Sequence, residues 1–429
     1  MIRKVYKFGG ASVKDAAAVR NLASIVSSHS DGDILLVVSA MGKTTNMLES
    51  ILAESRRQGG RAGLEILDPL VDFHLGIMDE LFSDDSHNEV YKVFDSQIQA
   101  LYVLLSRTDL DYDCHYDQTV SFGELLSTLI VAAYLNRTRL NTRWLDARRY
   151  VVTDHTFRSA SVDWAETGRR IKSLNLEHTE GSLFITQGFI GSTADGKHTT
   201  TLGREGSDYS AAIFANCLNA SEVTIWKDVD GLLNADPKRF PQTVKIPHIS
   251  YPEAIELAFY GATVIHPKTM KPLQNKNIAL HVRSFIHPEN EPTVIDGRPD
   301  SGPSVPSYIV KDRQTLVSFS PRDYSFMNEH NLKTIFAACD SLRIHANMIQ
   351  TSALMLSLCI DSDENRLSAL IDCLREQFSI KYNDGLQLFT VRHRAGEQPS
   401  EIEKEFMKGK KVIVKQGSRS TLQFVLKTV

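Results

Sequence analysis

The feature that most restricts the fold is the recurrence of short apolar runs that would be hydrophobic on both faces of a β-strand. Such runs stand at residues 34–38 ("ILLVV"), 182–191 ("SLFITQGFIG"), 222–231 ("EVTIWKDVDG") and 279–285 ("ALHVRSF"). A strand without a polar face is typical of the interior of a parallel sheet. Helical patterns lie between the runs, so residues 1–286 are predicted to form an α/β domain with helices on both faces of a parallel-rich sheet.

Length and composition narrow the class further. The 429 residues exceed what one compact domain usually holds, and 42% hydrophobic with 23% charged residues is typical of globular proteins in water. The net charge of −4 gives no indication of a basic face for nucleic acid. No apolar run reaches the length of a membrane span or a signal peptide. The five cysteines are scattered without a Cys-x-x-Cys pair, so we expect a reduced, cytoplasmic protein.

The composition changes at residues 287–306, which are rich in proline and glycine and are predicted to be a linker. Beyond it, Leu354, Leu356 and Leu358 alternate as on one face of a strand. The pattern predicts a small α+β unit at 307–385 and a second one of similar plan at 386–429. We expect the second unit to be truncated, ending before a last helix and strand.

Two glycine-containing loops have the composition of anion-binding sites. "YKFGGASV" (6–13) places Lys7 and two glycines at the end of an apolar strand, which favours a phosphate, although Lys7 could equally be solvated. In "TTTLGREGSDYSAAIFANCL" (199–218), Arg204 lies between glycines and Asp208 opens a helix whose first N–H groups could bind an anion. The alternative is a tight loop with an ordinary helix cap.

Two further stretches carry charges near strand or helix ends. "WKDVDGLLNADPKRF" (226–240) crowds acids and bases after a strand, where open α/β sheets bind ligands, although its DG and DP pairs also indicate simple turns. Glu124 in "VSFGELL" opens an apolar helix. A carboxylate there often only complements the helix dipole.

Taken together, these stretches resemble motifs of the aspartate kinases, which have the amino-acid kinase fold. The matching motifs occur in the family's order: "KFGGAS", "SAMGKTTNML", "SFGE", "TTTLGREGSDYSAA", "WKDVDGLLNADPKRF" and "YGATVIHPKT". Beyond the linker, three stretches resemble paired regulatory ACT domains: "SPRDYSFMNEHNL", "NMIQTSALMLSL" and "QGSRSTLQFVL". The resemblance implies a kinase that transfers the γ-phosphate of Mg-ATP to the side-chain carboxylate of L-aspartate. This is the first step of lysine, threonine and methionine biosynthesis.

The resemblance also implies roles for individual residues. Lys7 and Asp208 would be catalytic, with Lys7 neutralising the phosphates and Asp208 orienting it. Arg204 would bind the α-carboxylate of aspartate and Glu124 its ammonium group. The remaining substrate-binding positions are Thr45 and Ser207. The positions that would bind ATP are Lys7, Gly9, Gly10, Lys227, Asp228, Leu233, Lys238, Thr263 and Val264. We expect Mg²⁺ to arrive with ATP, because no protein metal cage is evident.

Several positions depart from the family pattern. Glu205 stands where relatives usually have glycine, and Thr263 stands where many have lysine. Lys227 occupies a position where threonine is common, so we hypothesise that it replaces the missing cation. In lysine-inhibited relatives an acid commonly follows Ser352, and another occupies the position of Asn347. These two candidate allosteric positions therefore predict weakened lysine sensitivity, with lysine, threonine or no effector remaining open. A homodimer through the ACT units is expected by family analogy.

Three alternatives remain at this stage. A kinase of glutamate or N-acetylglutamate is disfavoured by "SFGE" and the ACT-like units. An inactive amino-acid sensor is disfavoured because Lys7, Arg204 and Asp208 are all present. A fusion with a dehydrogenase would need a longer chain.

Overall fold

The computed structural model forms two compact units and describes most of the chain. The described residues are 4–29, 33–60, 63–85, 87–174, 183–262, 265–298, 305–394, 396 and 398–428. The first unit comprises Met1–Leu232, Pro247–Ile255 and Val264–Pro299. The second comprises Leu233–Ile246, Glu256–Thr263 and Asp300–Val429.

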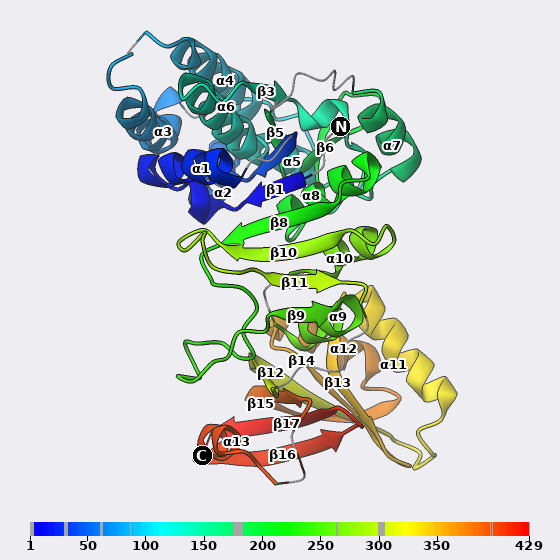
Figure 1. Cartoon of the computed structure of the whole chain (residues 1–429). Helices are drawn as coiled ribbons and strands as arrows, with labels where there is room; N and C mark the ends of the chain where they lie inside the picture. The colour runs from blue at the N-terminus through cyan, green and yellow to red at the C-terminus, as the bar shows by residue number, and fades with distance from the viewer. Residues whose placement is uncertain are drawn as a thin grey trace. The chain divides into compact units, whose positions relative to one another are not determined.

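The first unit is built on an eight-stranded sheet, with helices on both of its faces (Figure 1). Its strands, in spatial order, are β3 (Thr142–Leu145), β5 (Leu183–Gln187), β2 (Ile34–Val38), β1 (Lys4–Phe8), β8 (Glu222–Lys227), β10 (Ala279–Ser284), β11 (Thr293–Asp296) and β9 (His248–Ser250). All neighbours pair in parallel except β10 and β11. The prediction of a parallel-rich sheet between helices is confirmed.

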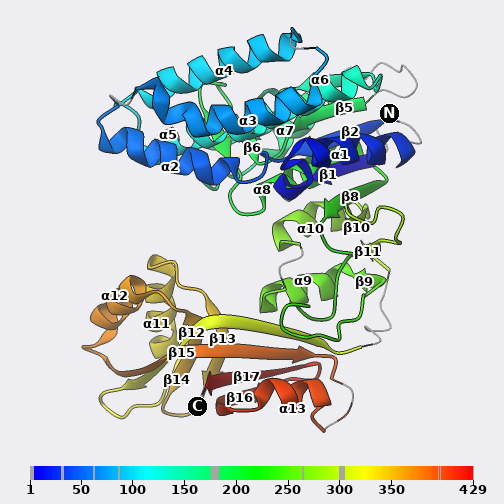
Figure 2. The ribbon, with the colours of Figure 1, turned by 90° about the vertical axis from the view of Figure 1, so that its left-hand side faces the viewer.

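The helices of this unit divide between the two faces. The helices are α1 (Ala16–His29), α2 (Thr44–Arg57), α3 (Asp68–Leu81), α4 (Glu89–Leu105), α5 (Tyr112–Val120), α6 (Phe122–Arg137), α7 (Trp164–Lys172), α8 (Gly206–Leu218), α9 (Tyr251–Tyr260, which continues into the second unit) and α10 (Pro267–Gln274). Tyr6 and Phe8 of β1 belong to the core formed with α1–α4 and α6, which lie together in Figure 2. Side chains alternate along a strand, so Lys7 points to the other face, where α8 packs.

A small second sheet borders the large one. It is formed by β4 (Val152–Thr153), β6 (Ile190–Thr193) and β7 (Thr199–Thr201). The apolar run at 182–191 is therefore divided at Gly188 between β5 and β6. A Cβ on Gly188 would lie 2.6 Å from that of Ser207, so only glycine fits beside the start of α8.

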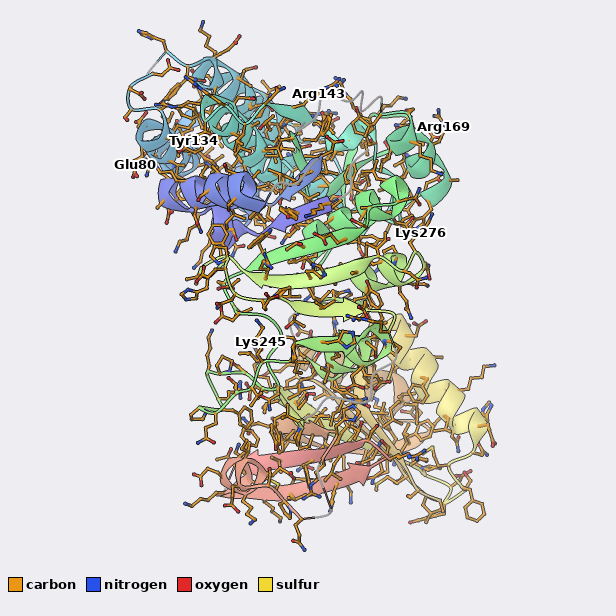
Figure 3. All side chains as sticks on the ribbon, in the orientation of Figure 1. Glu80, Tyr134, Arg143, Arg169, Lys245 and Lys276 are labelled. Atoms are coloured by element: carbon orange, nitrogen blue, oxygen red, sulfur yellow. The ribbon has the colours of Figure 1, made fainter. Side chains whose placement is uncertain are left out.

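The stretch Tyr112–Arg137, which holds α5 and α6, is long and apolar enough to cross a membrane, but 72% of its most apolar part is buried in the protein. It packs as a core helix pair of the first unit. The periphery of this unit is polar instead, and Figure 3 shows Arg143, Arg169 and Lys276 there.

Part of the segment expected to be a linker belongs to the sheet. Residues 293–296 of the predicted linker 287–306 form β11, which pairs with β10 and β9. Thr293 and Ile295 alternate as buried side chains. Four residues are too few for a hydrophobic period to stand out against the surrounding prolines and glycines.

The second unit contains one six-stranded antiparallel sheet. Its strands, in spatial order, are β13 (Ala346–Thr351), β14 (Leu356–Asp361), β12 (Ser307–Pro321), β15 (Phe378–Arg392), β17 (Thr421–Thr428) and β16 (Lys410–Gly417). Its helices are α11 (Glu329–Ser341), α12 (Glu364–Leu374) and α13 (Glu401–Met407). α11 and α12 cover one half of the sheet, and α13 packs on the other half. Two ACT-like halves are therefore present, as predicted.

The two halves share their longest strands. Residues 314–321 of β12 pair with 378–386 in the first half, whereas residues 307–311 pair with 388–392 in the second. The second half therefore takes a strand from residues that precede the first half in the sequence. Within the described residues, this half has one helix, α13.

Candidate active site

A pocket of about 440 Å³ lies in the first unit where β1 and β2 end. Its walls come from the segments that follow β1, β2 and β5 and from the loop between β7 and α8. Ligands of open α/β sheets bind at such carboxyl ends of strands. The pocket brings together seven of the residues predicted from sequence: Lys7, Gly10, Thr45, Glu124, Arg204, Ser207 and Asp208.

A buried carboxylate with two lysines lies at the base of this arrangement. Asp208, in the first turn of α8, is 1% exposed. Its Oδ1 is 2.7 Å from Nζ of Lys7 and its Oδ2 is 3.8 Å from Nζ of Lys227. Burial by itself would raise the pKa of Asp208, but the ammonium groups of Lys7 and Lys227 outweigh it and lower the pKa. Asp208 is therefore an anion that pairs closely with Lys7 and lies near the charge of Lys227.

The loop after β1 approaches the loop after β2 very closely. A Cβ on Gly10 would lie 2.9 Å from the carbonyl oxygens of both Ala40 and Gly42, and Gly42 N–H donates a hydrogen bond to Gly10 O. A side chain at Gly10 would push the two loops apart. Only glycine fits at this position near Lys7, and glycine-containing loops of this kind suit phosphate binding through the backbone.

Glu124 presents a buried carboxyl group to the pocket. It is 3% exposed, and its Oε1 accepts a hydrogen bond from Ala40 N–H at 3.2 Å. Its Oε2 has no hydrogen-bond partner among the described residues. Burial raises the pKa of Glu124 to about 8, although the Ala40 N–H group and the charge of Lys7 act against the rise. A ligand with a positive charge would satisfy this oxygen and favour the ionised form.

The loop between β7 and α8 has an unusual backbone. Gly203 and Glu205 both have positive φ, +76° and +55°. A Cβ on Gly206 would lie 2.6 Å from the ring of Phe189, so this loop packs tightly against the segment after β5. Arg204 is exposed between the two positive-φ residues, next to the N-terminus of α8. Its guanidinium and the free N–H groups of the helix suit an anion.

Comparison with known proteins identifies the family. Residues 3–284 match the amino acid kinase family. Lysine-sensitive aspartokinase 3 of Escherichia coli is 33% identical over 363 residues, which cover 83% of this chain and 78% of that relative. The chain belongs to the aspartokinases, within the amino acid kinase family.

Solved aspartokinases have the same fold along the whole chain. The structure is similar to that of E. coli aspartokinase III in complex with aspartate and ADP (R-state), with a TM-score of 0.82 and 27% identity, covering 99% of this chain and 96% of that one. For the same enzyme with lysine and aspartate (T-state) the TM-score is 0.79 at 28% identity, covering 99% and 95%. The chain spans 41–70% of the length of the plant relatives it matches.

Among the described residues, the remaining positions predicted to bind ATP do not line the pocket. Gly9 adjoins Lys7, because its Cβ position would be 3.4 Å from the lysine Nζ. Asp228 is exposed directly after β8. Leu233 and Lys238 belong to the second unit.

The last two nucleotide positions, Thr263 and Val264, lie outside the described residues. Both allosteric candidates lie in the second unit. Asn347 is buried: its Oδ1 accepts from Lys311 Nζ and its Nδ2 donates to Gln314 and Asp361. Ser352 is exposed in the turn between β13 and β14.

Sequence reasoning missed several residues that line the pocket, notably Ser39, Tyr116, Arg158 and Phe189. Tyr116 comes from α5 and Arg158 from the loop that follows β4. Neither segment has the glycine-rich composition of an anion-binding loop, and the aspartates near Tyr116 do not indicate an anionic ligand. Their place in the pocket depends on tertiary packing.

Proposed function

We propose that this chain is an aspartate kinase that converts Mg-ATP and L-aspartate to ADP and β-aspartyl phosphate. The proposal rests above all on one observation. A single pocket holds the Lys7–Asp208 ion pair together with Glu124, whose buried oxygen lacks a partner, and with exposed Arg204. These groups match a substrate that carries an ammonium group, a carboxylate and a second, reacting carboxylate.

The reaction needs charge stabilisation more than proton transfer. The side-chain carboxylate of free aspartate has a pKa of about 4, so it is already ionised and needs no general base. The barrier comes from bringing this anion to the phosphate and from the charge that develops on the phosphoryl oxygens. In the proposed mechanism Lys7 neutralises that charge, and buried Asp208 holds Lys7 in position.

We assign the orientation of the substrate to two groups of opposite charge in the pocket, Glu124 and Arg204. Glu124 would accept hydrogen bonds from the substrate ammonium through its unpaired Oε2. Arg204 would bind the α-carboxylate through two parallel hydrogen bonds, and Thr45 and Ser207 would supply further ones. Bound in this way, the side-chain carboxylate is directed to Lys7.

The nucleotide would bind where β1 and β8 end. Lys7, the N–H groups near Gly9 and Gly10, and Lys227 suit its phosphates, and we also assign Asp228, Leu233, Lys238, Thr263 and Val264 to its surroundings. The described residues contain no group of three or more His, Cys, Asp or Glu side chains arranged for a metal ion. We propose that Mg²⁺ arrives with ATP and is held mainly by its phosphates, where it would add positive charge beside the γ-phosphate.

Regulation and assembly are proposed from the second unit. The E. coli relative has been solved with lysine, so an amino-acid effector, lysine or threonine, is proposed for the ACT-like halves of this chain. We further propose a homodimer formed through these halves and a cytoplasmic location.

The test is incubation of the purified protein with Mg-ATP, L-aspartate and hydroxylamine, which traps an acyl phosphate as a coloured hydroxamate. Aspartate-dependent colour supports the proposal, and Lys7→Ala is the matched inactive control. Colour with glutamate but not aspartate would assign a different substrate. The absence of colour with either would favour an inactive amino-acid sensor.

A further inference from the structure

Arg158 is a strained residue at the edge of the pocket, outside the set predicted from sequence. It lies between β4 and α7 and lines the pocket together with Arg204 and Glu205. Its φ is +65°, a left-handed conformation that L side chains rarely adopt and that glycine adopts without strain. Strain of this kind persists where surrounding structure enforces it and often accompanies function.

A buried carboxylate fixes the backbone of Arg158. Asp117 of α5 is fully buried, and its two oxygens accept the Arg158 N–H at 3.1 and 3.0 Å. The same carboxylate accepts the N–H of Thr201 at 2.7 Å and its hydroxyl at 2.8 Å. Thr201 ends β7 and leads directly to Gly203 and Arg204. Asp117 therefore holds the Arg158 loop and the Arg204 loop in one fixed arrangement.

The two loops also touch. The carbonyl oxygen of Arg158 lies 3.1 Å from the position that a Cβ on Gly203 would take. The backbone of Arg158 is thus packed against the residue that immediately precedes Arg204. Both arginines belong to the same wall of the pocket.

The side chain of Arg158 is oriented by its neighbours, but its charge can still interact with a ligand in the pocket. Its guanidinium lies over the ring of Tyr116, 4.5 Å from the ring centre, and Tyr116 itself lines the pocket. Its Nη1 is 3.3 Å from Asp113, but both side chains are about half exposed. Water screens such a pair strongly. The aromatic ring orients the guanidinium plane, and an anion in the pocket can compete with Asp113 for it.

We propose that Arg158 is a substrate-binding residue whose guanidinium joins Arg204 in binding the α-carboxylate of the amino-acid substrate. This inference rests on the proposed aspartate kinase activity. Lys7 is assigned to the phosphates and the reacting carboxylate, so among the described residues that line the pocket Arg158 and Arg204 are the cations left for the α-carboxylate. Arg158 therefore contributes to the affinity for the substrate, whereas Lys7 stabilises the charge during phosphoryl transfer.

The test is Arg158→Gly, because glycine adopts the same backbone without strain. We expect the KM for L-aspartate to rise about tenfold, the loss of one charge-assisted contact. The kcat and the KM for ATP should change less than twofold, and the thermal midpoint should not fall. Arg139→Gly is the matched control: Arg139 has φ +64°, is exposed, and does not line the pocket. It should leave both KM values unchanged.

A second substrate isolates the contact. L-aspartate α-amide lacks the α-carboxylate charge, so Arg158→Gly should alter its KM less than twofold, and Arg158→Lys should recover part of the lost aspartate affinity. An unchanged aspartate KM in Arg158→Gly overturns the inference, as does an equal loss for both substrates with a lower thermal midpoint. If the wild-type protein itself makes no aspartate-dependent hydroxamate, the proposed function fails and takes this inference with it.

Discussion

The buried carboxylate of Asp208 lies between two lysine side chains. Asp208 is flanked by Lys7 on β1 and Lys227 on β8, whose strands are neighbours. If Lys227 replaces the cation that many relatives have at the position of Thr263, Lys227→Ala should raise the KM for ATP at least tenfold, because one phosphate contact is lost. Steady-state kinetics with ATP varied at saturating aspartate measure this.

Thr263→Ala serves as the comparison for this variant, and it should alter the KM for ATP less than twofold. A large effect at Thr263 with little effect at Lys227 would contradict the hypothesis. Circular dichroism of both variants shows whether either substitution disturbs the fold.

At the same scale, sequence reasoning found the residues that stand at strand or helix ends and missed those placed by packing. Lys7 and Asp208 could be predicted because Lys7 stands near the end of a strand and Asp208 in the first turn of a helix. Arg158 does not, because its position depends on Asp117, forty-one residues earlier in the chain. A buried hydrogen bond over that separation leaves no local pattern.

Among the elements, α3 carries a buried titratable group that links stability to pH. His74 is fully buried, its Nδ1 is 2.7 Å from Leu70 O, and its Nε2 is 3.5 Å from Thr44 at the start of α2. Burial lowers the pKa of His74 to about 4, although the contact with Leu70 O acts against the shift. The folded protein therefore keeps this ring neutral at pH values where an unfolded chain binds a proton.

Proton linkage gives the direction in which the His74 contribution to stability changes with pH. Between about pH 6.5 and 4 the unfolded state binds more protons, so stability contributed by His74 is present above pH 6.5 and is lost as the pH falls, by up to ~3 kcal/mol. Urea unfolding of wild type and His74→Gln should show a smaller loss of stability in the variant over this range. His87→Gln, which replaces an exposed histidine, is the control for this comparison. Parallel pH profiles for wild type and His74→Gln would contradict the prediction.

The elements also show where pattern reading succeeds. Strands β2, β5 and β8 are buried along all or most of their length, as their apolar runs predict. The run at 279–285 also forms a strand, β10, but buried and half-buried residues alternate along it, so the expectation of two apolar faces is wrong there. The strand β11 was missed because it has only four residues within a segment rich in proline and glycine. Burial along a whole strand leaves a clearer pattern in the sequence than four residues that pair between two other strands.

Across the whole chain, the two ACT-like halves are connected in a way that their order in the sequence does not predict. The order predicts two consecutive units, but residues 307–311 pair with 388–392. Such a pairing closes a loop of about eighty residues around the first half. Nothing in the five residues themselves distinguishes this partner from a nearer one, so the exchange of strands could not be predicted locally.

The second unit also bears on feedback control. Asn347 is neutral and its amide is already engaged by Lys311, Gln314 and Asp361, and Ser352 is followed by Ala353. A lysine ligand would find no carboxylate at either position to offset the desolvation of its ammonium group. We therefore expect half-inhibition only at millimolar lysine or above, measured as hydroxamate formation against lysine concentration. Ala353→Glu should lower that concentration, because it restores one carboxylate, whereas Ala353→Gln should not. Strong inhibition of the wild type at micromolar lysine would refute this account, since it would require an ammonium site elsewhere in the unit.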